Sequence, residues 1–117
     1  MSCPCGTGLP YDGCCGRLHR GEAVAATAEQ LMRSRYCAFA VGDAAYLLRS
    51  WHPTTRPRHL RLDPTEHWLR LEVLARTSGG LFDREGTVEF RAHAASGAQH
   101  ETSAFRRDDG WLYVGPA

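Results

Sequence analysis

Residues 88–106 have the sequence VEFRAHAASGAQHETSAFR, and this stretch decides the fold. Apolar and polar side chains alternate in each half, with Val88 and Phe90 on one face of the first half and Phe105 on one face of the second. A period of two over several residues is typical of a β-strand with one buried face. The Ser-Gly pair at residues 96–97 separates the halves and favours a hairpin turn. The stretch therefore predicts two antiparallel strands that share a buried face.

The same alternation predicts a further strand at residues 69–73, and residues 111–114 are predicted to form a last short strand. The connecting sequences at residues 78–80 and 108–110 contain glycine beside serine or aspartate, which is typical of hairpin turns. Strands that follow one another through such connections form an antiparallel meander of about four strands.

Two helices are predicted before the strands. Thr27 is a good N-terminal cap, and Gln30 three residues later completes a capping box. Apolar residues then recur at helical spacing until Gly42, which is expected to end the first helix. Asp43 can cap a second helix, which Pro53 ends.

A short third helix is predicted to begin at residues 63–66, where proline occupies the first turn and Glu66 follows it. Trp68 would lie near the end of this helix. Helices followed by an antiparallel meander define the α+β class, with the helices on one face of the sheet.

Four cysteines lie within the first fifteen residues, in the order Cys-Xaa-Cys, eight residues, Cys-Cys. Two such pairs joined by a glycine-rich loop can surround one tetrahedral ion, and Zn²⁺ is the usual occupant of an all-sulfur site. Four thiolates close the coordination shell, so the predicted zinc is structural and not catalytic. A redox-active or disulfide cluster is the alternative. The predicted ligands are Cys3, Cys5, Cys14 and Cys15.

Composition limits which cellular compartment and which classes of partner are expected for this chain. The net charge is +1, with 14 basic and 13 acidic residues, so no overall attraction to nucleic acid is expected. No apolar run approaches the ~20 residues of a membrane span, and the N-terminus has no basic-then-apolar signal. We therefore expect a cytoplasmic protein, where reduced thiols favour a metal over disulfides. The fifth cysteine, Cys37, is expected to pack as a small apolar residue.

The densest basic stretch lies between residues 56 and 61 and includes Arg56, Arg58, His59 and Arg61. Contact with RNA or with an acidic protein face is one interpretation of this segment. The other is a solvated loop stiffened by proline. Aromatic residues do not interleave with the arginines, as a binder of single-stranded nucleic acid would require.

Two features together indicate a known family. The cysteine spacing resembles the SEC-C motif, the zinc-binding motif also found at the C-terminus of the SecA translocation ATPase. The sequence around this motif resembles the bacterial YchJ family, whose similarity here rests on residues 31–36, 46–47, 51–53 and 100–105.

The resemblance implies two parts, a SEC-C-like zinc module at residues 1–22 and a domain of the nuclear-transport-factor-two-like fold at residues 23–117. Such a domain is a cone, in which a strongly curved antiparallel sheet wraps over three helices. Cones of this fold commonly enclose a cavity between sheet and helices. It serves as an active site in some proteins and as a ligand pocket in others, and in a third group side chains fill it.

Candidate cavity residues follow from the helix and strand phases. Arg35 lies on the inner face of the first helix, and Glu101 shares a strand face with the core residue Phe105. We expect Arg35 and Glu101 to be buried as an ion pair, either as a structural link or as a polar anchor for a ligand. The full candidate set is Arg35, Tyr36, Trp51, His52, Trp68, Glu101, Ser103 and Phe105.

Two functional hypotheses remain open. The first is a zinc-containing adaptor without enzymatic activity, whose zinc module contacts a protein or ribonucleoprotein partner. Its link to translation or protein export is implied by the SecA resemblance alone. The alternative is a small enzyme or small-molecule binder that uses the cone cavity. No Gly-Xaa-Ser-Xaa-Gly motif indicates a hydrolase.

Overall fold

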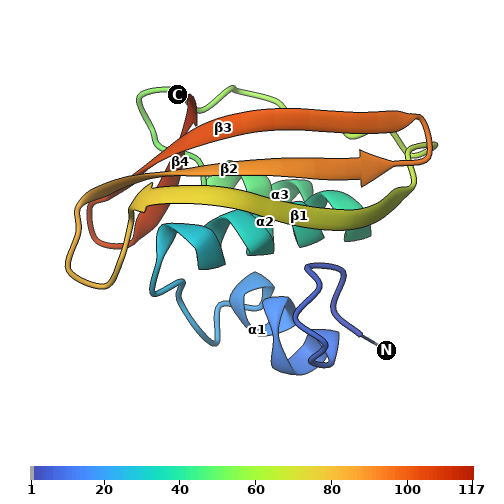
Figure 1. The fold of residues 1–117 in the computed structure, drawn as a ribbon, viewed down its shortest axis with the longest axis horizontal. Coiled ribbons are helices and arrows are strands. Elements are labelled where there is room, and N and C mark those ends of the chain that lie inside the picture. The colour runs from blue at the N-terminus through green and yellow to red at the C-terminus, as the bar shows by residue number, and fades with distance from the viewer. Residues whose placement is uncertain (1) are drawn as a thin grey trace.

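The computed structural model describes residues 2–117 of the 117-residue chain (Figure 1). Helical elements come first and strands second, as the sequence predicts. The elements are the 3-10 helix η1 (Tyr11–Gly13), the helices α1 (Cys15–His19), α2 (Ala28–Val41) and α3 (Ala44–Arg49), and the strands β1 (Trp68–Ser78), β2 (Glu85–Ala94), β3 (Gly97–Arg107) and β4 (Trp111–Pro116).

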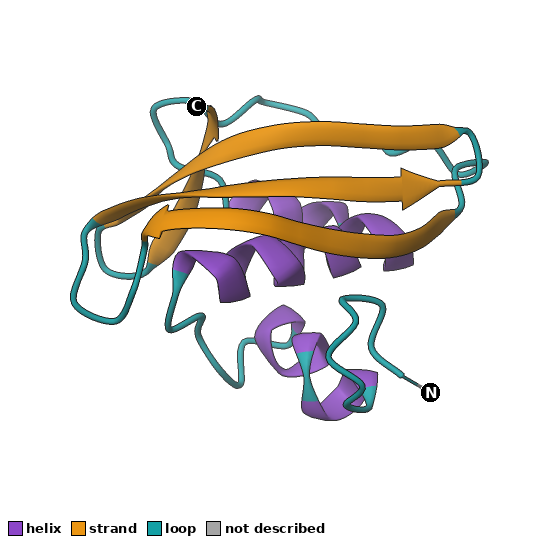
Figure 2. Cartoon of the chain, viewed as in Figure 1, coloured by secondary structure: helices purple, strands orange, loops and turns teal. Residues whose placement is uncertain are grey.

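The four strands form one antiparallel sheet in the order β1-β2-β3-β4. Helix α2 lies against one face of this sheet, and residues 2–20 lie on the side of α2 away from the strands (Figure 2). The fold is therefore α+β with helices on one face, which confirms the predicted class. No helix of the described residues is long and apolar enough to cross a membrane.

Strands β2 and β3 form the predicted hairpin, with Val88 opposite Ser103 and Phe90 opposite Glu101. Val88, Ser103 and Phe105 are buried. The alternation in residues 88–106 therefore identifies the inner face of the sheet correctly.

The predicted caps at Thr27 and Asp43 and the predicted helix end at Gly42 are confirmed, whereas the second helix ends at Arg49, before the predicted end at Pro53, because Trp51 bridges to Tyr113. The Thr27 hydroxyl accepts a hydrogen bond from the Gln30 backbone N–H at 3.1 Å. Gly42 ends α2 in the left-handed region at φ 79°, a conformation that glycine adopts without strain. The Asp43 carboxylate then accepts from the Tyr46 N–H at 3.0 Å and begins α3.

The predicted third helix at residues 63–68 does not form. The Asp63 carboxylate accepts hydrogen bonds from both the backbone N–H and the hydroxyl of Thr65, at 2.9 and 2.6 Å. These bonds close a turn in place of a helical cap. Trp68 is consequently the first residue of β1 and not the end of a helix.

Strand β1 departs from simple alternation. Its register against β2 shifts between Trp68 and Arg70 and again between Val73 and Ala75. A bulge adds one residue to a strand and reverses the faces that follow it. As a result Leu69 is 66% exposed, although its alternation with Leu71 and Val73 predicted a shared face.

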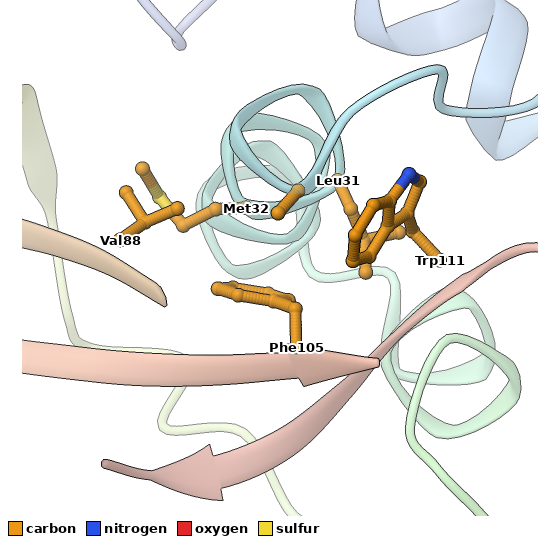
Figure 3. Packing of buried hydrophobic residues seen from close by; sticks show 6 residues of the cluster. Leu31, Met32, Val88, Phe105 and Trp111 are labelled. Atoms are coloured by element: carbon orange, nitrogen blue, oxygen red, sulfur yellow. The ribbon is translucent and has the colours of Figure 1, made fainter. Parts of the chain in front are cut away.

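The core lies between α2 and the inner face of the sheet (Figure 3). Leu31 and Met32 of α2 face Val88 and Phe105 of the sheet, and Trp111 of β4 covers the N-terminal end of α2. The Trp111 indole also donates a hydrogen bond to the Ala26 carbonyl at 3.2 Å.

Candidate functional site

The side chains of the four N-terminal cysteines converge, so that their sulfur atoms surround a common centre. The Sγ atoms of Cys3, Cys5, Cys14 and Cys15 all lie within 4.8 Å of one another, and the Cys5–Cys14 separation is 3.7 Å. Tetrahedral Zn–S bonds of about 2.3 Å place sulfurs about 3.8 Å apart. The donor set therefore fits a tetrahedral metal ion with soft ligands.

Local backbone structure creates this convergence. The loop after Cys5 turns at Gly6 and Gly8, whose φ angles of 89° and 84° favour glycine. The Cys3 N–H then donates to the Leu9 carbonyl at 2.7 Å, which closes the loop. The second pair of cysteines lies at the start of α1.

The four thiols are too close to ionise together without a cation. Hydrogen bonds with Cys37 and Cys5 raise the pKa of the Cys15 thiol well above its usual range. Burial raises the pKa of the Cys14 thiol. A divalent metal at the centre would stabilise the thiolates and so lower the pKa values of these thiols.

Cys37 is buried as predicted, but its surroundings are not simply apolar. It is 0% exposed, and its Sγ lies 3.4 Å from the Sγ of Cys3. Helix α2 thus brings a fifth sulfur against the cysteine cluster. Sequence spacing gave no signal for this contact, because it depends on how the first twenty residues dock on α2.

Polar contacts hold the cysteine-containing segment on α2 and α3. The Arg33 guanidinium donates to the Cys5 carbonyl at 2.7 Å. The buried His19 ring lies 2.8 Å from the Ser34 carbonyl oxygen, and Arg49 donates to the His19 carbonyl at 2.5 Å. Leu18 adds apolar contact with buried residues of α2 and α3.

A cavity of about 180 Å³ lies between α2 and the inner face of the sheet. Four residues of α2 at helical spacing form one wall: Met32, Arg35, Tyr36 and Phe39. The sheet and the segment after α3 supply the remaining walls. Seven predicted candidates lie around this cavity, namely Arg35, Tyr36, Trp51, Trp68, Glu101, Ser103 and Phe105.

Sequence reasoning missed the other lining residues, which are Met32, Phe39, Phe90, Ala92, Gln99 and Tyr113. The spacing of Met32 and Phe39 relative to Arg35 could have placed them on the same helical face. Tyr113 gave no such signal, since its position depends on how β4 curves past Trp51. The two rings lie edge to face with centroids 5.1 Å apart.

The structure places His52 outside the cavity lining. Its ring nitrogens lie 2.9 Å from the Asp108 carboxylate and 2.8 Å from the Thr54 hydroxyl. Its backbone N–H donates to the Tyr113 carbonyl at 2.7 Å. His52 therefore links the segment after α3 to the β3–β4 turn and β4.

The predicted Arg35–Glu101 ion pair is not formed, so that prediction was wrong. Among the described residues no carboxylate oxygen lies within 4.0 Å of the Arg35 guanidinium. Glu101 is half-buried, and its Oε2 accepts hydrogen bonds from the hydroxyls of Ser103 and Tyr113. These neighbours satisfy the carboxylate in place of the guanidinium.

Arg35 instead has only neutral partners. Its Nη1 donates to the Leu47 carbonyl at 2.7 Å and to the Ser50 hydroxyl at 2.6 Å. Its guanidinium lies 5.0 Å from the ring centre of Trp51 and 4.4 Å from that of Tyr113. Burial lowers the pKa of Arg35 to about 10, so the side chain remains charged at neutral pH.

Fold and site together define a cone domain with an internal cavity and a cluster of four cysteines whose geometry fits a metal ion. The sequence model described as YchJ, middle NTF2-like domain, matches residues 27–116. The chain belongs to this family.

Relatives and solved structures cover almost the whole chain. It is 57% identical to a UPF0225 protein of Streptomyces coelicolor, over 96% of this chain and 91% of the relative. It is 56% identical to a UPF0225 protein of Corynebacterium glutamicum, over 95% of this chain and 92% of the relative.

Two solved structures share the fold. The solution structure of RPA3114, a SEC-C motif containing protein from Rhodopseudomonas palustris, has a TM-score of 0.84 and 34% identity, and the match covers 100% of this chain and 98% of that one. The crystal structure of a SEC-C motif containing protein from Psychrobacter arcticus has a TM-score of 0.80 and 30% identity, with 100% and 82% covered.

Proposed function

We propose that the protein binds a small organic ligand in the cone cavity and that a structural zinc ion holds the N-terminal segment against α2 and α3. The observation that carries the proposal is a charged, buried Arg35 at the wall of an aromatic cavity, with no carboxylate partner. A buried charge without an ion-pair partner is costly, so its retention at the wall of an open cavity favours a role in binding over a purely structural one.

The dimensions suit a compact ligand. An engineered cavity of about 150 Å³ in another protein binds benzene, so about 180 Å³ can hold one aromatic ring with a small substituent. The lining is mainly aromatic, with a few polar groups, which is the usual composition of a ligand pocket.

The zinc has a mechanical role in this proposal. Four thiolates leave no position for a bound water, so the metal offers no open site for Lewis-acid catalysis. Its effect is to keep the loop of residues 3–15 compact, so that Arg33 and Cys37 of α2 meet it. A cytoplasmic location, where thiols stay reduced, suits a site of this kind.

An adaptor role is the second candidate. The cysteine-containing segment leaves Leu9 53% exposed, and Val24 just beyond it is 83% exposed. An apolar side chain beside a rigid metal loop could contact a protein or ribonucleoprotein partner. Native-lysate capture by wild-type and Leu9→Ser protein tests this role, because a specific partner should be lost from the variant.

The ligand-binding proposal predicts a localised response to benzamide as a neutral probe. Titration followed by amide NMR should shift signals of cavity-lining residues. Gln99→Trp, which places a bulky ring at the exposed cavity rim, should weaken binding about tenfold, or ~1.4 kcal/mol. Ala98→Trp is the matched control, because Ala98 is also exposed but lies on the opposite face of β3.

Equal affinity of benzamide for the Gln99→Trp and Ala98→Trp proteins would contradict the cavity as the binding site. Shifts confined to surface residues away from α2 and the inner sheet face would do the same.

A further inference from the structure

We infer that the ligand of the cone cavity is a small apolar monocarboxylate whose carboxylate group binds Arg35. This inference rests on the proposed function and specifies its ligand.

The Arg35 side chain is a preformed donor. It is only 6% exposed, and its hydrogen bonds are made by Nη1 alone, which leaves Nε and Nη2 without a partner among the described residues. The Trp51 and Tyr113 rings pack against the guanidinium and restrict its movement. A guanidinium with free N–H groups on two neighbouring nitrogens matches the paired oxygens of a carboxylate.

The charge of Arg35 favours an anionic ligand. A buried charge is costly unless an opposite charge accompanies it, and the Leu47 carbonyl and Ser50 hydroxyl that bond Arg35 carry none. Glu101 lines the same cavity, but its carboxylate accepts from Ser103 and Tyr113 and forms no ion pair with the guanidinium. A ligand that brings a negative charge and acceptor oxygens would therefore stabilise the Arg35 guanidinium.

Glu101 limits the ligand to a single negative charge. Among the described residues that line the cavity, Glu101 alone is acidic. Its carboxylate accepts hydrogen bonds from the hydroxyls of Ser103 and Tyr113. A second carboxylate or a phosphate group would be repelled by this charge at short range. The rest of the ligand meets Tyr36, Phe39 and other rings, which favours an aromatic or otherwise apolar body.

Three probes of nearly equal size separate the possibilities: benzoate, the neutral benzamide and the cationic benzylamine. Affinities are measured by calorimetry or NMR titration of the zinc-loaded full chain. Benzoate should bind at least about tenfold more tightly than benzamide, and benzylamine should bind most weakly. In Arg35→Gln the preference for benzoate over benzamide should fall to about twofold or less.

A second variant keeps the inference testable if the Arg35→Gln protein does not fold. Glu101→Gln removes the negative charge of the cavity wall, so it should strengthen benzoate binding several-fold relative to benzamide binding. Benzamide binding as tightly as benzoate, or benzylamine binding most tightly, would overturn the carboxylate inference and leave the proposed function standing. An unchanged preference for benzoate over benzamide in Glu101→Gln would also overturn the inference. Failure of all three probes to bind would overturn the proposed function itself.

Discussion

Cys5→Ser protein should lose its zinc and become less stable by more than ~3 kcal/mol. Structural zinc contributes roughly 10–16 kcal/mol of binding free energy in zinc-finger peptides, and this energy stabilises the folded chain. Here the Cys5 sulfur is buried, and its carbonyl accepts a hydrogen bond from Arg33 of α2. Loss of the metal therefore disturbs both the loop and the packing of α2. Elemental analysis and denaturant unfolding measure the two effects.

Cys37→Ala is the matched control for the metal. Its sulfur touches that of Cys3, but it lies outside the group of four sulfurs that converge within 4.8 Å. The variant should keep about one zinc per chain and lose only ~1 kcal/mol, as expected for a small core truncation. Full zinc content and unchanged stability in Cys5→Ser would contradict the assignment of the cluster as a metal site.

Trp111→Ala should destabilise the cone by ~3–5 kcal/mol, the usual range for removing a buried tryptophan. Trp111 is 4% exposed and packs in the main core cluster, where it joins β4 to α2. Its indole also donates to the Ala26 carbonyl, which would lose its partner. The change is measured as the difference in unfolding free energy from urea titration.

Phe82→Ala provides the control for Trp111→Ala. Phe82 is 93% exposed in the connection between β1 and β2, so its removal should change stability by less than ~0.5 kcal/mol. A loss below ~1 kcal/mol in Trp111→Ala would show that the core is not organised around β4 and α2 as described.

Local chemistry explains which parts of the fold could be predicted. The hairpin of β2 and β3 and the caps at Thr27 and Asp43 follow from residues within a few positions of one another. The prediction of a third helix was wrong because Asp63 bonds Thr65 in a turn and Trp68 packs against Tyr36. That last contact spans 32 positions (68 minus 36) and leaves no local pattern.

The sequence predicted which residues of the candidate site point inward, but not which side chains bond one another. Helical phase placed Arg35 inward, and strand alternation did the same for Glu101. Which groups bond each other depended on Tyr113 and Ser50, whose positions are set by the curvature of β4 and the end of α3. The contact of Cys37 with Cys3 likewise follows from docking of the N-terminal segment.

The four-cysteine cluster and the cavity lie on opposite sides of one helix. Arg33 and Cys37 contact the cysteine-containing segment, while Arg35, Tyr36 and Phe39 line the cavity. This arrangement makes α2 the common support of both sites. The expectation that follows is that loss of zinc alters ligand binding through the position of α2.

The most direct test of the account is the side-chain Nε–H signal of Arg35 in ¹H–¹⁵N NMR spectra during titration with benzoate. The account predicts that this signal shifts and saturates with the same dissociation constant as the amide signals of the cavity-lining residues. Exposed arginines such as Arg58 and Arg61 serve as internal controls and should not shift. An unchanged Arg35 signal at saturating benzoate, or a shift limited to the exposed arginines, would contradict the account.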